Sequence, residues 1–230
     1  MRFLTTSFLA IAVGGSAFAV DPAKTRLFIL SGQSNMAGLN PDVSFTPALK
    51  AAYPNDEIVV VKSAQGGQPI RRWHKAWKAP EGSKIKPTGT NGDLYDKLMA
   101  EVKKASAGKK FDTVSFVWMQ GERDAKEGLA AVYFDSLRGL IDQLQGDLRR
   151  KDITLVIGRL SDNGKDASWK ALREAQVAFA EKQPLSAWVD TDDLNGDKDD
   201  LHYTKEGYAE LGKRFAAKTI ELLKKSSGSK

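Results

Sequence analysis

Five short apolar runs that contain β-branched residues recur along this chain of 230 residues and alternate with longer amphipathic segments. Short apolar runs bounded by polar residues are typical of strands that are buried on both faces of a sheet. Because strands that alternate with helices form parallel sheets through right-handed crossovers, the pattern predicts an α/β fold with a five-stranded parallel sheet. The predicted strands are 27–30, 58–61, 114–118, 153–157 and 187–189.

The segments between the predicted strands have apolar residues at helical spacing. Leu94, Leu98 and Val102 share one face, and the same spacing recurs in 129–144 and 169–179. A final helix is expected from about residue 205 to 224, with Thr204 placed to cap its first turn. Helices in these positions would cover both faces of the sheet, which predicts a three-layer α/β/α sandwich.

The first nineteen residues have the features of a secretory signal peptide. Arg2 precedes an apolar stretch, and the small-residue pattern Ala17-Phe18-Ala19 follows it. The apolar stretch is too short and too polar for a membrane span, and no later segment approaches one. We therefore expect a signal peptide over 1–19, a single domain over 20–230, and an exported protein, either secreted or periplasmic, that is free of the membrane.

Composition excludes several kinds of chemistry. The chain has no cysteine, so it has neither disulfides nor a thiolate metal site, and a cysteine nucleophile is excluded. The formal net charge is +6, but no aromatic residues interleave with the lysine clusters. Basic charge without stacking aromatics argues against a nucleic-acid partner.

A serine follows the first predicted strand directly, in the sequence Gly32-Gln33-Ser34-Asn35-Met36. Ligands bind at the carboxyl ends of strands in open α/β sheets, so Ser34 is placed to meet a substrate. Far downstream, His202 follows Asp199 by three residues. An imidazole oriented by a carboxylate is what a serine needs to become a nucleophile, and the pattern predicts a serine hydrolase.

Other polar or glycine-rich segments also follow predicted strands. Gly66 and Gly67 come after the second strand, and Gln120 and Glu122 after the third. Because the carboxyl ends of parallel strands share one edge of the sheet, we expect these segments to converge on Ser34. The long irregular stretch 66–92 is expected to shape the site.

These motifs together resemble those of the SGNH hydrolase superfamily, and within it the sialate O-acetylesterase-like group that includes carbohydrate esterase family 6. The resemblance rests on four ordered segments: 32–36, 66–70 with Trp73, 118–122 with Asp124, and 199–202. It implies a flavodoxin-like fold and a serine esterase that removes acetyl groups from carbohydrates, with neither metal nor organic cofactor. Where many SGNH enzymes have an asparagine, this chain has Gln120, as the acetylesterase-like group does.

The implied mechanism assigns a role to each motif. His202 takes the proton of Ser34 as its hydroxyl attacks the ester, and Asp199 orients the imidazole. The N–H groups of Ser34 and of Gly66 or Gly67, with the Gln120 amide, are expected to bind the oxyanion. The expected substrate contacts are Gln33, Asn35, Arg71 and Trp73.

Several alternatives stay open at this point. Ser34 by itself fits an ordinary turn, and Glu122 competes with Asp199 as the acid that orients His202. His74 lacks a neighbouring carboxylate, which favours a surface or substrate-contact role over that of a base. The aspartates of 190–200 lack the ligand spacing of a calcium loop. The competing functions are an inactive carbohydrate-binding module of the same fold and an esterase that acts on lipid esters.

Overall fold

The computed structural model describes residues 23–85, 90–198 and 200–227. Its centre is a parallel sheet of five strands in the order β2-β1-β3-β4-β5, which is the flavodoxin-like order. Each of the five predicted strands is confirmed, with ends that differ by at most three residues from the observed ones. The strands are β1 (Thr25–Gly32), β2 (Glu57–Ala64), β3 (Thr113–Met119), β4 (Thr154–Gly158) and β5 (Ser186–Val189).

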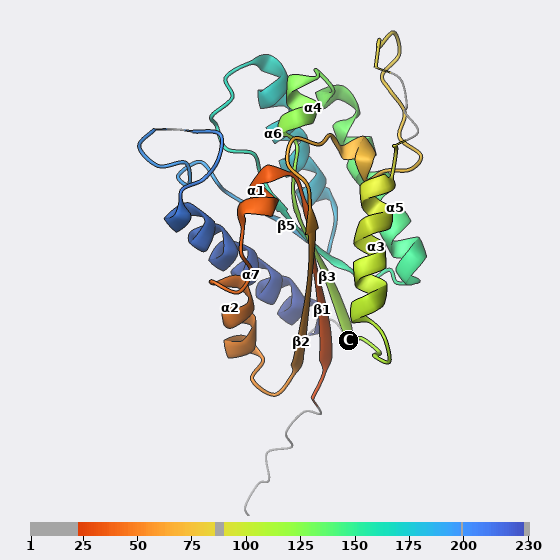
Figure 1. Ribbon diagram of the computed structural model, residues 1–230, viewed down its shortest axis with the longest axis vertical. Helices are drawn as coiled ribbons and strands as arrows, with labels where there is room; N and C mark the ends of the chain where they lie inside the picture. The colour runs from red at the N-terminus through yellow and green to blue at the C-terminus, as the bar shows by residue number, and fades with distance from the viewer. Residues whose placement is uncertain (1–22, 86–89, 199, 228–230) are drawn as a thin grey trace, which may run out of the picture.

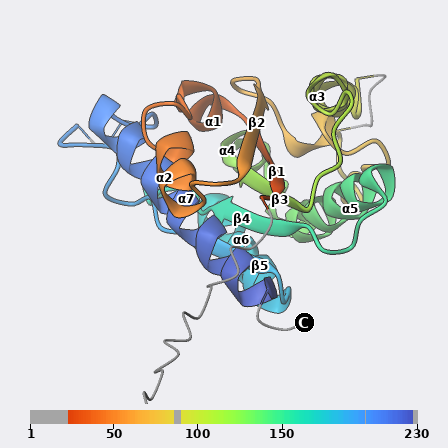
Figure 2. The ribbon, with the colours of Figure 1, turned by 90° about the horizontal axis from the view of Figure 1, so that it is seen from below.

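Helices cover both faces of this sheet (Figures 1 and 2). One face carries α2 (Phe45–Ala52) and α7 (Lys205–Ser227), which pack on each other. The opposite face carries α3 (Asp93–Ala105), α5 (Ala130–Leu148) and α6 (Ala167–Lys182), and α5 packs on α6. The three-layer α/β/α prediction is therefore confirmed, and it follows from right-handed crossovers on either side of β1.

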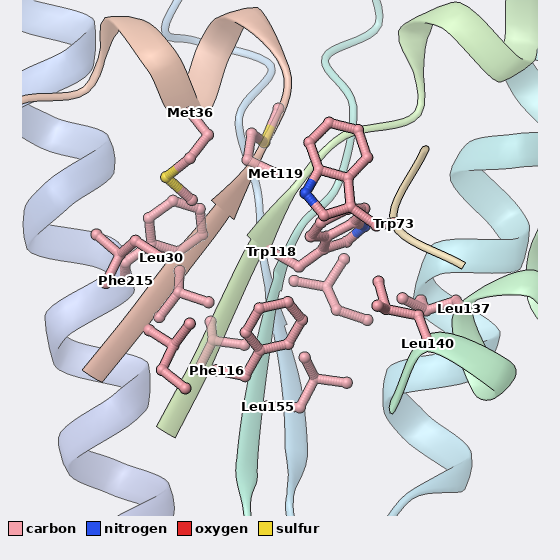
Figure 3. Packing of buried hydrophobic residues seen from close by; sticks show 14 of the residues in the cluster. Leu30, Met36, Trp73, Phe116, Trp118, Met119, Leu137, Leu140, Leu155 and Phe215 are labelled. Atoms are coloured by element: carbon pink, nitrogen blue, oxygen red, sulfur yellow. The ribbon is translucent and has the colours of Figure 1, made fainter. Parts of the chain in front are cut away.

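The core lies between these layers and consists mainly of strand residues with alternating directions. Trp118 of β3 meets Trp73 edge to face, with ring centroids 5.3 Å apart. On the other face, Leu30 of β1 and Met36 lie toward Phe215 of α7 (Figure 3). All five side chains are at most 1% exposed, so burial of both faces explains why the strands are apolar throughout.

Four short elements were not predicted, and two of them carry residues of the site. These are α1 (Ser34–Gly38), α2, the 3₁₀ turn η1 (Ile70–Arg72) and α4 (Glu122–Lys126). At the start of α7, the N–H of Gly207 donates to Thr204 Oγ1 at 2.9 Å, which confirms the predicted cap. The predicted signal peptide lies outside the described residues. In the part of the chain that the structure describes, no helix is long and apolar enough to cross a bilayer.

Candidate active site

The strand order reverses between β1 and β3, and the candidate site lies at the carboxyl ends of these two strands. Open α/β sheets bind their ligands at such a switch point. Ser34 follows β1, Gln120 and Glu122 follow β3, and β2 leads into Gly66. The sheet topology therefore brings together three of the four segments that the sequence singled out (Figure 1).

A glycine lets the chain turn sharply between β1 and the serine. Gly32 has φ = 146°, and a Cβ at this position would overlap the backbone carbonyl of Met119 on β3. The close approach allows the Gln33 N–H to donate to the Met119 carbonyl at 2.9 Å. The turn places Ser34 at the first residue of α1, where it is partly exposed.

The glycine pair after β2 lies beside this serine. A Cβ built on Gly66 would be 3.6 Å from the Ser34 Cβ. Among the described residues, nothing accepts a hydrogen bond from the N–H groups of Ser34, Gly66 or Gly67. Backbone donors that have no other partner and lie around a nucleophile are suited to hold a developing oxyanion.

Asn35, the residue after the serine, joins the site to the histidine loop. Its Nδ2 donates to Glu122 Oε1 at 3.0 Å and to the Leu201 carbonyl at 3.1 Å. Its Oδ1 accepts a hydrogen bond from Tyr208 Oη at 3.1 Å. Because Leu201 immediately precedes His202, these bonds bring the histidine loop to the edge of the sheet where Ser34 lies.

His202 itself is exposed, in the loop between β5 and α7. Its imidazole and the Ser34 hydroxyl form no hydrogen bond with each other in this structure. Asp199, the expected orienting acid, lies outside the described residues. The rival acid, Glu122, is 2% exposed and accepts from Asn35, and no hydrogen bond joins it to His202 in the described part of the chain.

The amide of Gln120 is turned toward the protein interior. Gln120 is fully buried, and its Nε2 lies within hydrogen-bond distance of Asp124 Oδ2 at 2.6 Å, of the Gln68 carbonyl at 3.1 Å and of Gln33 Oε1 at 3.2 Å. Two N–H hydrogens that face three protein acceptors leave none for an oxyanion. This corrects the expectation for Gln120: the side chain ties the β3 loop to its neighbours, and the backbone N–H groups are the available donors.

Two buried carboxyl groups, Glu122 and Asp124, lie in the short helix α4 that follows β3. Burial raises the pKa of Glu122 to about 7, and the hydrogen bond from Asn35 opposes this rise. Burial likewise raises the pKa of Asp124 to about 7, against the hydrogen bonds from Gln120 and from the Ile70 N–H. Both groups therefore titrate near neutral pH. Nothing in the sequence indicates that the pKa of either carboxyl group is raised.

Three of the four expected substrate contacts lie in the interior. Gln33 and Asn35 are each 2% exposed, and Trp73 is 1% exposed beneath the site. Arg71 forms a bidentate pair with Glu127, with distances of 2.5 and 3.4 Å. Gln33, Asn35 and Trp73 therefore build the site rather than line its surface, which corrects the expectation of direct contact for these three. Arg71 is partly exposed, and its contact with substrate stays a prediction.

His74 also lies elsewhere than expected. It is partly buried against α5, and a Cβ at Gly139 would overlap its ring. Its Nδ1 is buried and has no hydrogen-bond partner among the described residues, and burial lowers the pKa of the ring. A packing role against α5 replaces the expected surface or substrate-contact role.

The aspartates that precede the histidine loop are paired with arginines. Asp192 binds Arg159 and Arg173 at 2.8 and 2.7 Å, and Asp193 binds Arg214 at 2.6 Å. Within the described ranges, no three histidine, aspartate or glutamate side chains form a group that could hold a metal ion. Arginine pairs thus account for Asp192 and Asp193, and also for Asp190, which Arg159 contacts at 2.7 Å.

A flavodoxin-like sheet with a serine at its switch point is the arrangement of the SGNH-like esterases, and the chain is a carboxylic ester hydrolase of this class. A family model described as "Carbohydrate esterase, sialic acid-specific acetylesterase" matches residues 38–221. The chain belongs to this family of carbohydrate acetylesterases. The matched range begins at residue 38, so it does not include Ser34, and the role of the serine segment stays a prediction from its motif and its place after β1.

Individual relatives agree with this family. A protein of Arabidopsis thaliana described as a probable carbohydrate esterase is 25% identical over 201 residues, which cover 85% of this chain and 69% of the relative. A solved Arabidopsis thaliana structure has a TM-score of 0.66 at 22% identity and covers 86% of this chain and 98% of its own. The solved structure of a carbohydrate acetylesterase from Xanthomonas citri has a TM-score of 0.63 at 19% identity. The match covers 85% of this chain and 56% of the Xanthomonas citri chain. The two structures support the fold.

Proposed function

We propose that this chain is an exported serine esterase that removes O-acetyl groups from a carbohydrate through an acetyl-enzyme intermediate. Support comes from the family, whose description names acetylesterase activity, and from relatives described as carbohydrate esterases. The observation that carries the mechanism is the bond from Asn35 to the Leu201 carbonyl, which joins the residue after Ser34 to the residue before His202. This bond supports the proposal that the two catalytic side chains act in one site.

In the proposed reaction, His202 removes the proton from Ser34 Oγ as this oxygen attacks the acetyl carbonyl carbon. The N–H groups of Ser34 and of Gly66 or Gly67 stabilise the negative charge on the carbonyl oxygen. The sugar oxygen leaves with the proton held by His202, and water then hydrolyses the acetyl-enzyme with His202 again as the base. Asp199 would orient the imidazole and stay ionised.

Removal of either proposed catalytic side chain tests this mechanism. We expect Ser34→Ala and His202→Ala each to lower kcat for acetate release from 4-nitrophenyl acetate and from acetylated carbohydrate on the order of a million-fold, because these groups act as a unit. Retained activity in both variants would refute the mechanism. Ser136→Ala, which removes a hydroxyl that bonds the Val132 carbonyl within α5, serves as the control and should leave kcat unchanged.

The orienting acid is tested by removing one charge at a time. Asp199→Asn should lower kcat on the order of ten-thousand-fold, because an amide holds the imidazole in the wrong tautomer. Glu122→Gln should have a small effect, since its amide oxygen can still accept the bond from Asn35. The reverse pattern would transfer the orienting role to Glu122.

A further inference from the structure

We propose that Asn35 is a positioning residue that holds the loop of His202 in place next to Ser34. Glu122 and Tyr208 fix the orientation of the Asn35 amide. The inference rests on the proposed function, because it assigns how the serine and the histidine of that site are kept in place. It replaces the substrate-contact role expected for Asn35, whose side chain is 2% exposed.

The hydrogen-bond partners of the Asn35 amide determine its orientation, that is, which of its two terminal atoms is the nitrogen and which is the oxygen. A carboxylate oxygen and a carbonyl oxygen both face Nδ2, at 3.0 and 3.1 Å, so this atom must be the nitrogen. The Tyr208 hydroxyl donates to the opposite atom, Oδ1, at 3.1 Å. An amide with a partner on every side cannot rotate without losing buried hydrogen bonds, and each loss is costly in the interior.

The three partners of Asn35 come from different parts of the fold. Glu122 begins α4 after β3, Leu201 lies in the loop after β5, and Tyr208 lies in the first turn of α7. Asn35 itself lies in α1, next to Ser34. One side chain therefore links α1 to both flanks of the histidine loop, and a shift of the serine would carry this loop with it.

Among the described residues, two further hydrogen bonds hold the histidine loop on either side of His202. The Asn195 side chain donates to the Asp200 carbonyl, and the Thr204 N–H donates to the Leu194 carbonyl at 3.2 Å. Between these anchors, the Leu201 carbonyl is bound by Asn35. The imidazole of His202 is exposed and has no hydrogen bond to a described residue, so among the described contacts the backbone anchors are the ones that position it.

Tyr208 also fixes α1 by packing. A Cβ at Gly38, the last residue of α1, would overlap the Tyr208 ring. This ring stacks edge-on against Tyr203, with centroids 5.6 Å apart, and Tyr203 follows His202. Tyr208→Phe would keep both ring contacts and remove only the hydroxyl that orients Asn35, which makes it a specific probe.

The test combines kinetics with a direct view of the histidine. Asn35→Ala should lower kcat per titrated active site about a hundred-fold, as expected when catalytic groups are misplaced by about 1 Å, and should leave KM nearly unchanged. Asn35→Asp should lose more, because its acceptors would face Glu122 and the Leu201 carbonyl. Tyr208→Phe should lose only a few-fold, since the two Nδ2 bonds remain.

The position of the imidazole is read by NMR without substrate. The chain has two histidines, so the spectrum of His202→Ala assigns the His202 resonance directly. We expect this resonance to shift and broaden in Asn35→Ala, to move less in Tyr208→Phe, and to stay in place in the control Ser136→Ala. Thermal unfolding verifies that each variant is folded, and Tyr208→Phe keeps the test decisive if the Asn35 variants do not fold.

An unmoved His202 resonance in folded Asn35→Ala would overturn the proposal, whether or not kcat falls. A moved resonance with unchanged kcat would overturn it as well, because the histidine would then need no positioning. Full activity of Ser34→Ala would instead refute the proposed function, and this result does not depend on the resonance. The two failures are therefore distinguishable.

Discussion

At the scale of single residues, the unusual feature is the pair of carboxyl groups that are buried in α4, Glu122 and Asp124. One oxygen of Glu122, Oε2, and one of Asp124, Oδ1, are buried with no partner among the described residues. A buried carboxylate without full hydrogen bonding is costly, so each group binds its proton more tightly than in the unfolded chain. This is the cause of the pKa values near 7.

These raised pKa values predict a loss of stability with rising pH. The folded state binds more protons than the unfolded state between the ordinary carboxyl pKa and about 7, so the contribution of Glu122 is complete below about pH 4.5 and is lost as pH rises through 7. Urea unfolding should therefore show a wild-type free energy of unfolding that falls from pH 5 to pH 8. Glu122→Gln should reduce this fall by up to about 3 kcal/mol.

The matched control is Glu206→Gln, which changes an exposed glutamate in the first turn of α7. It should leave the pH dependence as in the wild type. Asp124→Asn should act like Glu122→Gln, because its pKa is raised by the same cause. An equal slope in wild type and Glu122→Gln would show that Glu122 is not protonated in the folded state.

At the scale of elements, the serine helix α1 is too short to be stable by itself. Its five residues form barely more than one turn, and isolated helices need more than twice that length. Lys62 of β2 compensates by donating from Nζ to the carbonyls of Ala37 at 2.9 Å and Leu39 at 2.6 Å, with a longer bond to that of Met36. The strand beside β1 thus caps the helix that carries Ser34.

Removal of this cap should destabilise the fold near the site. Lys62→Met keeps the length of the side chain and leaves the carbonyls of α1 unpaired, so the free energy of unfolding should fall by about 1–3 kcal/mol. Lys50→Met, which changes an exposed lysine in the last turn of α2, should change it by less than about 0.5 kcal/mol. Equal urea midpoints for both variants would contradict the capping role.

At the scale of the whole molecule, the sheet order brings residues more than 160 positions apart into contact. The bond between Asn35 and Leu201 spans 166 residues, and the bond between Tyr208 and Asn35 spans 173. Arginine pairs fasten the segment before the histidine loop to α7 and to the end of β4, through Arg214 and Arg159. The site therefore depends on completion of the whole fold.

Export is a property of the whole chain and is tested on it. We propose cleavage after Ala19, at the small-residue pattern that ends the predicted signal peptide. Expression of the full chain in a Gram-negative bacterium should yield a protein in the periplasm or the medium whose N-terminal residue is Val20. Recovery of uncleaved protein from the cytoplasm would refute export, and a variant with Arg inserted into the apolar stretch provides the negative control.

The sequence by itself determined the order of the main strands and helices. The spacing of apolar residues and the glycines at strand ends are local signals that can be read without the tertiary structure. It also predicted which segments carry the chemistry, since each follows a strand. Only the tertiary structure decided that Gln33, Asn35, Gln120 and Trp73 are interior supports. Their polarity or aromaticity suggested contact with substrate, but burial depends on long-range packing that no local pattern encodes. The short helices α1 and α4 were missed for the same reason: tertiary contacts stabilise them, not helical periodicity.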